Sequence, residues 1–351
     1  MANMAQAIRL ALHYGEEHLG VTDIFGEDVG APLGGVFTCT QGLKTAWNTP
    51  LDERGLIGMA LGIAYGGGKP VAEIQFCDYI FNCIDLLKLC GNAHWSSAGE
   101  YHVPLVVMTP VGAGIHGSMY HSHSFESMAT HIQGWTVVMP SNAKDAYGLM
   151  LSAIADPNPV LFMAPKGLMR AKGEELIPGE PADERALHHA IDAPVGDRTG
   201  WAPHWPPVED YRVPFGKARL ARQGSAVTVV SYGRALTMCT HVADDLTKQG
   251  LSVEVIDLRT LYPFDEQAVF ASVKKTGRLL VVNEDTEVTN FGEHVMRKVV
   301  DHCFYDLLAP PRLLAGLDVP GVGLAWGYEK HSIPQPDGIA AAIRELAAQQ
   351  P

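Results

Sequence analysis

The stretch GWTVVMPSNAKDAYGLMLSAIADPNPVLFMA, residues 134–164, decides the fold class of this chain. Its two ends, 135–140 and 159–164, are short apolar runs that predict buried strands. Between them, residues 143–155 have the apolar spacing and the length of a helix. A strand, a helix and a second strand at this spacing form the crossover unit of a parallel sheet, so the stretch predicts an α/β fold.

The same alternation extends through the first half of the chain. Apolar runs of strand length alternate with longer segments of helical spacing, which is typical of a parallel sheet with helices on both faces. The expected strands are 21–25, 71–76 and 105–109, and the expected helices are 4–17 and 84–93.

The alternation stops between residues 179 and 214. This stretch holds six prolines, three histidines and two tryptophans without a sustained period, so we expect a linker that runs over the surface. Because 351 residues exceed the size of one hydrophobic core, we divide the chain into domains 1–178 and 215–351, separated by the linker 179–214.

Regular patterning returns after the linker and predicts a smaller, second doubly wound domain. We expect strands near 226–233, at 252–257 and at 278–283, and helices at 235–249, 265–276, 292–302 and 338–348, the last capped by Asp337.

Composition excludes several classes of function. The 26 basic and 39 acidic residues give a formal charge of −13, which opposes binding to nucleic acid and to anionic membrane surfaces. The first twenty residues are amphipathic rather than a signal peptide, and no apolar stretch is long enough to span a bilayer. The six cysteines lack metal-ligand spacing, which indicates reduced thiols in a bacterial cytoplasm or a matrix-like compartment, with the cytoplasm favoured.

Carboxylates occupy positions at which α/β folds often carry catalytic or ligand-binding groups. Glu27 and Asp28 directly follow the first expected strand, at the edge where ligands bind in such sheets. Thr49 or Asp52 can cap a helix of small and apolar residues whose first turn contains Glu53. A solvated turn and an ordinary helix-capping acid explain these positions as well, so position alone leaves both interpretations open.

A glycine-rich segment, VGAGIHGSMYHSH at 111–123, carries His116, His121 and His123. Imidazole titrates near neutral pH, so a histidine here can move protons. A histidine that only bonds the backbone and a three-histidine metal site are the alternatives.

In order along the chain, the segments FGEDVG, GGVFTCTQGL, NTPLDERGLIGMALG, KPVAEIQFCDYIF, HSHSFE, VVMPSNAKDAYGLM and DPNPVLF resemble one family. VIDLRTLYPFDE, VKKTGRLLVVNE and LAPPRLL continue the match in the second domain. The family is that of β-subunits of the thiamin-diphosphate-dependent decarboxylase component of 2-oxo-acid dehydrogenase complexes, in the transketolase-like superfamily. The resemblance implies a pyrimidine-binding transketolase-like domain followed by a transketolase C-terminal-like domain.

The resemblance also implies roles for individual residues. Glu53 matches the glutamate that bonds a pyrimidine nitrogen and activates the cofactor. Tyr79 matches the aromatic residue on which the pyrimidine rests, Leu51 an apolar residue of the same pocket, and Glu27 an acid near the cofactor. His121 matches the active-site histidine, which assists proton transfers and the reductive acylation of a lipoyl group.

Metals and partners follow from the same resemblance. Leu105, Ala153, Asp156 and Asn158 match a structural potassium site, although an ordinary polar turn fits the same residues. Relatives hold the diphosphate and Mg²⁺ with a GDG segment followed by an asparagine, and this chain has only Gly196-Asp197-Arg198 in the linker. The resemblance therefore implies an α-subunit that holds the diphosphate and Mg²⁺ in an α2β2 heterotetramer, and docking to a lipoyl acyltransferase core.

EIQFCDYIF and the long insertion favour the branched-chain 2-oxo-acid subgroup, with the 2-oxoisovalerate reaction expected. Pyruvate and acetoin dehydrogenase β-subunits and a non-catalytic assembly subunit are the alternatives. The chain departs from the family at three places: His94–Ser97 replaces an RYRS segment, HSHSFE replaces HSQSPE, and DVPGVGLAWGYEKHSIP replaces a DTPFP pattern. The last departure lies in the domain that docks the acyltransferase in relatives.

Overall fold

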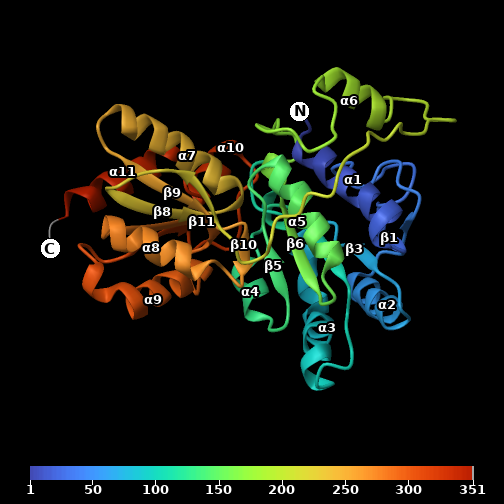
Figure 1. Ribbon diagram of the computed structural model, residues 1–351, viewed down its shortest axis with the longest axis horizontal. Helices are drawn as coiled ribbons and strands as arrows, with labels where there is room; N and C mark the ends of the chain where they lie inside the picture. Colours follow the sequence, from blue (N-terminus) through green and yellow to red (C-terminus); the bar gives the residue numbers. More distant parts are fainter. Residues whose placement is uncertain (350–351) are drawn as a thin grey trace. The chain divides into compact units, whose positions relative to one another are not determined.

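A computed structural model describes residues 1–349, which gather into two compact units. The first unit consists of Met1–Pro110 and Ile132–Phe215, and the second consists of Val111–His131 and the described residues after Phe215 (Figure 1). The glycine-rich histidine segment therefore clusters with the C-terminal part of the chain, although it lies between two strands of the first unit in the sequence.

Six strands of the first unit lie side by side in the order β5-β6-β4-β3-β1-β2. The pairs β1–β2, β1–β3, β3–β4 and β5–β6 are parallel, as the crossover pattern predicts. Their carboxyl ends therefore meet at one edge of the sheet. The strands are β1 Asp23–Gly26, β2 Ala46–Asn48, β3 Pro70–Glu73, β4 Val106–Val111, β5 Thr136–Val138 and β6 Val160–Pro165.

Helix α1, Met4–Tyr14, packs along α5, Ala143–Ala155, and the two share one core with the sheet. A capping box fixes the start of α1, because the Asn3 and Gln6 side chains each accept the other residue's backbone N–H. The predicted helix over 4–17 changes to a π-helix at Gly15–Leu19 and ends at Gly20, whose φ is +76°. Helices α2, Glu53–Tyr65, and α3, Ile84–Ser96, complete the layer with the 3₁₀ helices Cys77–Cys83 and Lys166–Leu168.

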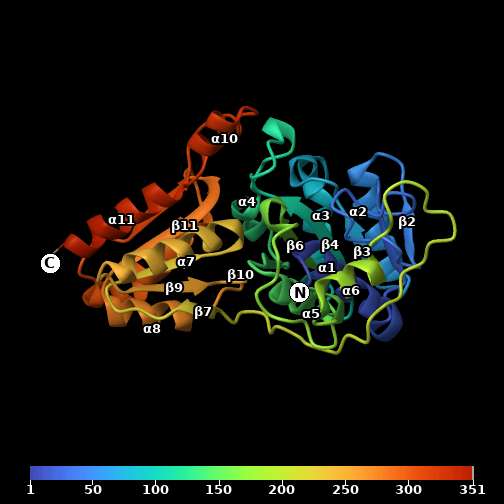
Figure 2. The same ribbon diagram turned by 90° about the horizontal axis from the view of Figure 1, so that it is seen from above.

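The segment after residue 178 is part of the first unit and runs along its outside (Figure 2). The expectation that this stretch lacks regular structure was wrong at one place, because Asp183 caps a helix, α6, Glu184–Ile191. This helix buries only Leu187 and Ile191, so its apolar signal is too short to show a period. The rest of the segment is attached to the first unit by isolated hydrogen bonds, such as the one from the Val213 N–H to the Gly148 carbonyl.

The second unit contains a sheet in the order β12-β11-β8-β9-β7, in which β7 alone is antiparallel to its neighbour. Figure 1 shows α7 and α11 on one side of this sheet and α8 and α9 on the other. The strands are β7 Arg219–Arg222, β8 Val227–Ser231, β9 Val253–Asp257, β11 Leu279–Thr286 and β12 Arg312–Gly316, with a short β10 at Thr260–Tyr262. The helices are α4 Glu126–His131, α7 Gly233–Lys248, α8 Glu266–Thr276, α9 Phe291–Cys303, α10 Trp326–Ser332 and α11 Pro336–Ala348.

Two expectations for the second unit need correction. Asp337 does not cap the last helix, because α11 begins one residue earlier with Pro336 and Gln335 precedes it. Proline suits the first helical position, where its missing N–H costs nothing. The edge strands β7 and β12 were not predicted, since both are only partly buried and therefore lack an apolar run.

Candidate functional site

Carboxylates gather at the carboxyl edge of β3, β1 and β2. Glu27 and Asp28 follow the end of β1, and Glu53 begins α2 shortly after β2. Of the two predicted caps for α2, Asp52 is the cap, since its Oδ1 accepts the Gly55 N–H at 2.9 Å. The helix therefore starts beside the strand ends and directs its N-terminus, which favours negative charge, toward this edge.

Glu53 is half-buried at the first position of α2. Its Oε2 accepts a hydrogen bond from the side-chain nitrogen of Asn82 at 3.1 Å. We expected Glu53 to stand among interior residues, but the next two residues, Arg54 and Gly55, are exposed. The carboxylate is therefore placed at the surface end of an otherwise apolar helix, and Asn82 is a partner that the sequence pattern did not reveal.

The environment of Glu27 is more unusual than that of Glu53. Both of its carboxylate oxygens are buried and lack a hydrogen-bond partner within residues 1–349. The pKa of Glu27 is raised to about 7, mainly by burial and to a smaller extent by the negative charges of Glu53, Asp28 and Asp52. A carboxyl group with this pKa holds and releases a proton near neutral pH, which is the property that general acid–base catalysis requires.

Glu73, the last residue of β3, was not predicted as a site residue. It is only 6% exposed, and burial raises its pKa to about 8, with smaller contributions from Asp28 and Glu27. The only available signal was a carboxylate at the end of the apolar run VAEIQF. Asp28 itself accepts a hydrogen bond from the Gln75 side chain, so part of the cluster is held by a neutral donor.

The Glu73 environment predicts a pH-dependent cost to stability. Because its folded-state pKa, about 8, lies above the ordinary value of 4.5, the folded chain keeps a proton that the unfolded chain loses between these pH values. Stability therefore falls as pH rises through this window. Glu73→Gln should remove the cost, stabilising the chain by on the order of 3 kcal/mol at pH 8 and by little at pH 4.5. Urea unfolding of both chains across this range measures the difference, and a constant difference would contradict the prediction.

Tyr79 lies on the 3₁₀ helix Cys77–Cys83, half-buried, with its ring edge-on to Phe76 at 6.2 Å between centroids. A buried ion pair supports this segment. The Lys166 Nζ lies 3.9 Å from Asp78 Oδ2 and 5.3 Å from the centre of the Phe76 ring, and the two charged side chains are 0% and 3% exposed. Phe76 and Asp78, which precede Tyr79 in the sequence, are thus both contacted by the positive charge of the residue that follows β6.

The face that carries these groups is open in the first unit. Leu51, which the family resemblance assigns to the cofactor pocket, is 82% exposed, and Phe81 is also exposed. Apolar side chains at this exposure do not keep water away from a reacting centre. The geometry brings Glu27, Glu53 and Asp52 within electrostatic reach of one another, but it leaves Glu53 and Asp52 open to water.

His121 belongs to the second unit. It is half-buried, and its ring Nδ1 lies 3.3 Å from the Gly117 carbonyl oxygen. Its backbone N–H donates to the Ser118 carbonyl. His116 and His123 are exposed. Within residues 1–349 no group of three or more His, Cys, Asp or Glu side chains could hold a metal ion, so the geometry does not support the three-histidine alternative.

The predicted potassium ligands lie at the turn after α5. The Asn158 N–H donates to Asp156 Oδ1 at 2.8 Å, while the buried Asn158 Oδ1 lacks a partner in the described structure. The carbonyl of Leu105 accepts the Val160 N–H, and that of Ala153 accepts the Asp156 N–H. Carbonyls retain a second lone pair, and these carbonyls and the unsatisfied amide oxygen are the kind of oxygen ligand that a hard cation prefers.

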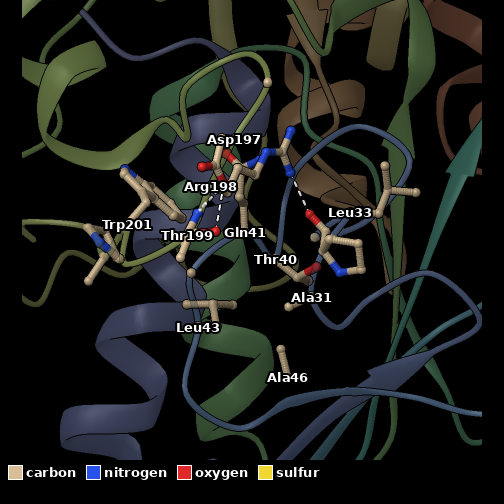
Figure 3. Close-up of a pocket in the computed structure, with 16 residues that line it drawn as sticks. Ala31, Leu33, Thr40, Gln41, Leu43, Ala46, Asp197, Arg198, Thr199 and Trp201 are labelled. Carbon is tan, nitrogen blue, oxygen red and sulfur yellow. Dashed lines mark hydrogen bonds between the residues drawn. The ribbon is translucent and has the colours of Figure 1, made fainter.

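A cavity of about 820 Å³ lies between the loop 31–46 and the segment 196–203 (Figure 3). None of the residues assigned to the cofactor lines it. Arg198 donates to the Pro32 carbonyl across it, and the buried Gln41 side chain accepts the Ala193 N–H. The segment that was predicted as a linker is therefore bonded to the loop after β1.

Comparisons with known proteins agree with this architecture. Residues 2–172 match the family described as "Transketolase, pyrimidine binding domain", and residues 216–339 match "Transketolase, C-terminal domain". The 2-oxoisovalerate dehydrogenase subunit beta of Bacillus subtilis is 36% identical over 97% of this chain and 97% of that protein. The subunit of the same name from Pseudomonas aeruginosa is 38% identical over 98% and 94%. The chain therefore belongs to the family of transketolase-like β-subunits of 2-oxo-acid dehydrogenases.

Two further comparisons bear on fold and subgroup. A solved structure described as "Split gene transketolase, inactive beta4 tetramer" covers 100% of both chains with a TM-score of 0.69 at 15% identity, which confirms the predicted fold. The pyruvate dehydrogenase E1 component subunit beta of Acholeplasma laidlawii is 36% identical over 99% of this chain and 98% of that protein.

All six cysteines are buried and none forms a disulfide. No helix in the described part of the chain has the length and apolar character needed to cross a membrane.

Proposed function

We propose that the chain is the β-subunit of a thiamin-diphosphate-dependent dehydrogenase that oxidatively decarboxylates a branched-chain 2-oxo acid, the 2-oxoisovalerate reaction, and transfers the acyl group to a lipoyl arm. The observation that supports it most strongly is the carboxylate pair Glu27 and Glu53 at the sheet edge, in a member of this family. Neither a buried carboxylate without a partner nor one on an open helix end improves packing, so structure alone does not account for them.

The residues fit the pyrimidine half of the cofactor. When bound, thiamin diphosphate supplies a nucleophilic carbon and stabilises the charge left when carbon dioxide departs. Glu53 would hold a proton against a ring nitrogen, and Tyr79 and Leu51 would contact the ring. The unpartnered oxygens of Glu27 can accept a hydrogen bond beside it. His121 would move protons during acyl transfer to the lipoyl group.

A partner has to complete this site. The open face around Leu51 needs a covering surface to exclude water, and the chain has no GDG segment for a diphosphate. Both observations support an α-subunit that binds the diphosphate and Mg²⁺, in an α2β2 heterotetramer. A lipoyl acyltransferase core would then receive the acyl group.

We extend the proposal to the cation and the compartment. The unsatisfied Asn158 oxygen supports K⁺ at the turn formed by Ala153, Asp156 and Asn158 beside Leu105. Six buried free thiols fit a reducing compartment, and we favour the bacterial cytoplasm over a mitochondrial matrix.

Co-expression with a candidate α-subunit tests the function. We expect the purified pair, supplied with thiamin diphosphate and Mg²⁺, to act faster on 3-methyl-2-oxobutanoate than on pyruvate or acetoin, and each chain alone to be inactive. Carbon dioxide release measures the reactions of the two 2-oxo acids, and acetaldehyde release measures the cleavage of acetoin. Activity of this chain alone would overturn the half-site, because no partner would then be needed.

The likeness to the pyruvate dehydrogenase subunit of Acholeplasma laidlawii makes pyruvate the second candidate. A pair that prefers pyruvate would keep the mechanism and change the substrate. Preference for acetoin would replace oxidative decarboxylation by cleavage of a hydroxyketone. A pair that is inactive on all three substrates would contradict the proposed function for that partner.

A further inference from the structure

The glycine-rich segment with His121 is anchored at both ends within the second unit. Near its start, the Ala113 N–H donates to Glu284 Oε2 at 3.2 Å. Just beyond its end, in α4, the Ser127 N–H donates to Asp285 Oδ2 at 3.1 Å, and the Ser127 hydroxyl donates to the same oxygen. Glu284 and Asp285 are neighbours in β11, so one strand fixes both ends of the loop.

A third carboxylate holds the middle of the loop. Glu329, on α10, accepts the backbone N–H of His116 with Oε2 at 2.9 Å, and its Oε1 lies 3.7 Å from His116 Nδ1. Glu329 is 2% exposed, so the bond is shielded from water. The Trp326 ring contacts the His116 ring edge-on, at 5.0 Å between centroids.

His116 needs such a support because its backbone is in the left-handed region, with φ at +58°. A residue with a Cβ is strained in this conformation and keeps it only where its surroundings impose it. The carboxylate of Glu329 accepts the N–H that this conformation directs toward α10, which makes Glu329 part of what imposes it.

The position of His116 affects His121 through the next residue, Gly117. The carbonyl of Gly117 lies 3.3 Å from His121 Nδ1. A carbonyl can only accept a hydrogen bond, so this contact favours the tautomer with the proton on Nδ1 and leaves Nε2 as the basic nitrogen. Moving residue 116 moves this carbonyl, and with it the orientation of the imidazole.

We propose that Glu329 is a positioning residue that fixes His121, through His116 and Gly117, for the lipoyl step. The inference rests on the proposed function, which assigns that step to His121. It also gives a purpose to the C-terminal segment that departs from the family pattern, since Glu329 and Trp326 both lie in it.

The test separates decarboxylation from transfer in the α/β complex. Carbon dioxide release with an artificial electron acceptor does not involve the lipoyl step, whereas reductive acylation of a lipoyl domain does. Glu329→Ala should slow the second reaction by about tenfold to a hundredfold, the cost of a misplaced catalytic group, and leave the first within about twofold. Glu329→Gln keeps an oxygen that can accept the His116 N–H, so it should restore most of the transfer.

Lys330→Ala is the matched control. Lys330 is the exposed neighbour of Glu329 on α10 and is not part of the proposed chain of contacts, so transfer should stay close to the wild-type rate. Chymotrypsin cleavage after the exposed Tyr120, mapped by mass spectrometry, reports on the loop without any turnover. We expect faster cleavage in Glu329→Ala only.

Wild-type transfer together with wild-type cleavage in Glu329→Ala would overturn the inference. So would an equal loss of both reactions, which indicates a general structural role. An inactive wild-type pair would instead contradict the proposed function, while the cleavage experiment would still show whether Glu329 holds the loop.

Discussion

Glu53→Gln in the α/β complex is expected to lower the rate of decarboxylation by about 10²- to 10⁴-fold, the usual contribution of a positioned acid or base. Glutamine has the same shape and can still accept the hydrogen bond from Asn82, so the fold and the start of α2 should not change. The amide cannot hold and release a proton against the cofactor. Carbon dioxide release at saturating substrate and cofactor measures the loss.

Glu174→Gln is the control for this variant, since Glu174 is an exposed glutamate of the same unit outside the proposed site. It should retain wild-type activity. If Glu53→Gln also retained full activity, Glu53 would be a helix-start acid with no catalytic role, and the non-catalytic assembly subunit would become the better interpretation.

Lys166→Met is expected to be the most destabilising single change discussed, at about 3–5 kcal/mol, because it leaves the buried Asp78 carboxylate without its nearest positive charge. Methionine fills most of the volume of the lysine stem, so the loss comes from charge rather than from a cavity. Chemical denaturation at neutral pH gives the free energy of unfolding. The double variant Lys166→Met/Asp78→Asn should recover much of it, since neither charge then remains.

The pair Lys172–Glu184 provides the comparison. Both of its side chains are more than half exposed, so Lys172→Met should cost less than about 1 kcal/mol. Equal effects of the two lysine substitutions would mean that water reaches the Lys166 ammonium group. The ion pair would then contribute little to fixing the segment that carries Tyr79.

The parallel sheet was predictable because each of its central strands is buried on both faces and therefore apolar in sequence. Helix 143–155 was predicted with the bounds that the structure gives, since Asn142 caps it and its apolar face is long. Three of the missed elements share a physical cause. Helix α6 and the strands β7 and β12 bury few side chains, so burial leaves little pattern in their sequence.

The candidate site divides in the same way. Glu53, Tyr79 and His121 could be proposed from the sequence because short motifs surround them. Glu73, Asn82 and Glu329 became visible only in three dimensions, since a buried carboxylate or a donor to one is defined by neighbours distant in the sequence. The roles of all the predicted site residues remain predictions, and the experiments on Glu53 and on the loop of His121 test two of them.

The attachment of residues 179–215 to the first unit also limits the positions at which related chains can recombine. The buried Arg9 guanidinium donates to the Ile191 carbonyl at 2.6 Å and to Asp192 Oδ1 at 2.7 Å, both in this segment. A recombinant that joined a foreign segment at residue 179 would separate this cation from its counter-ion. A crossover at the Phe215–Gly216 junction would keep them together, so inheritance of this insertion should follow the pyrimidine-binding half of the chain.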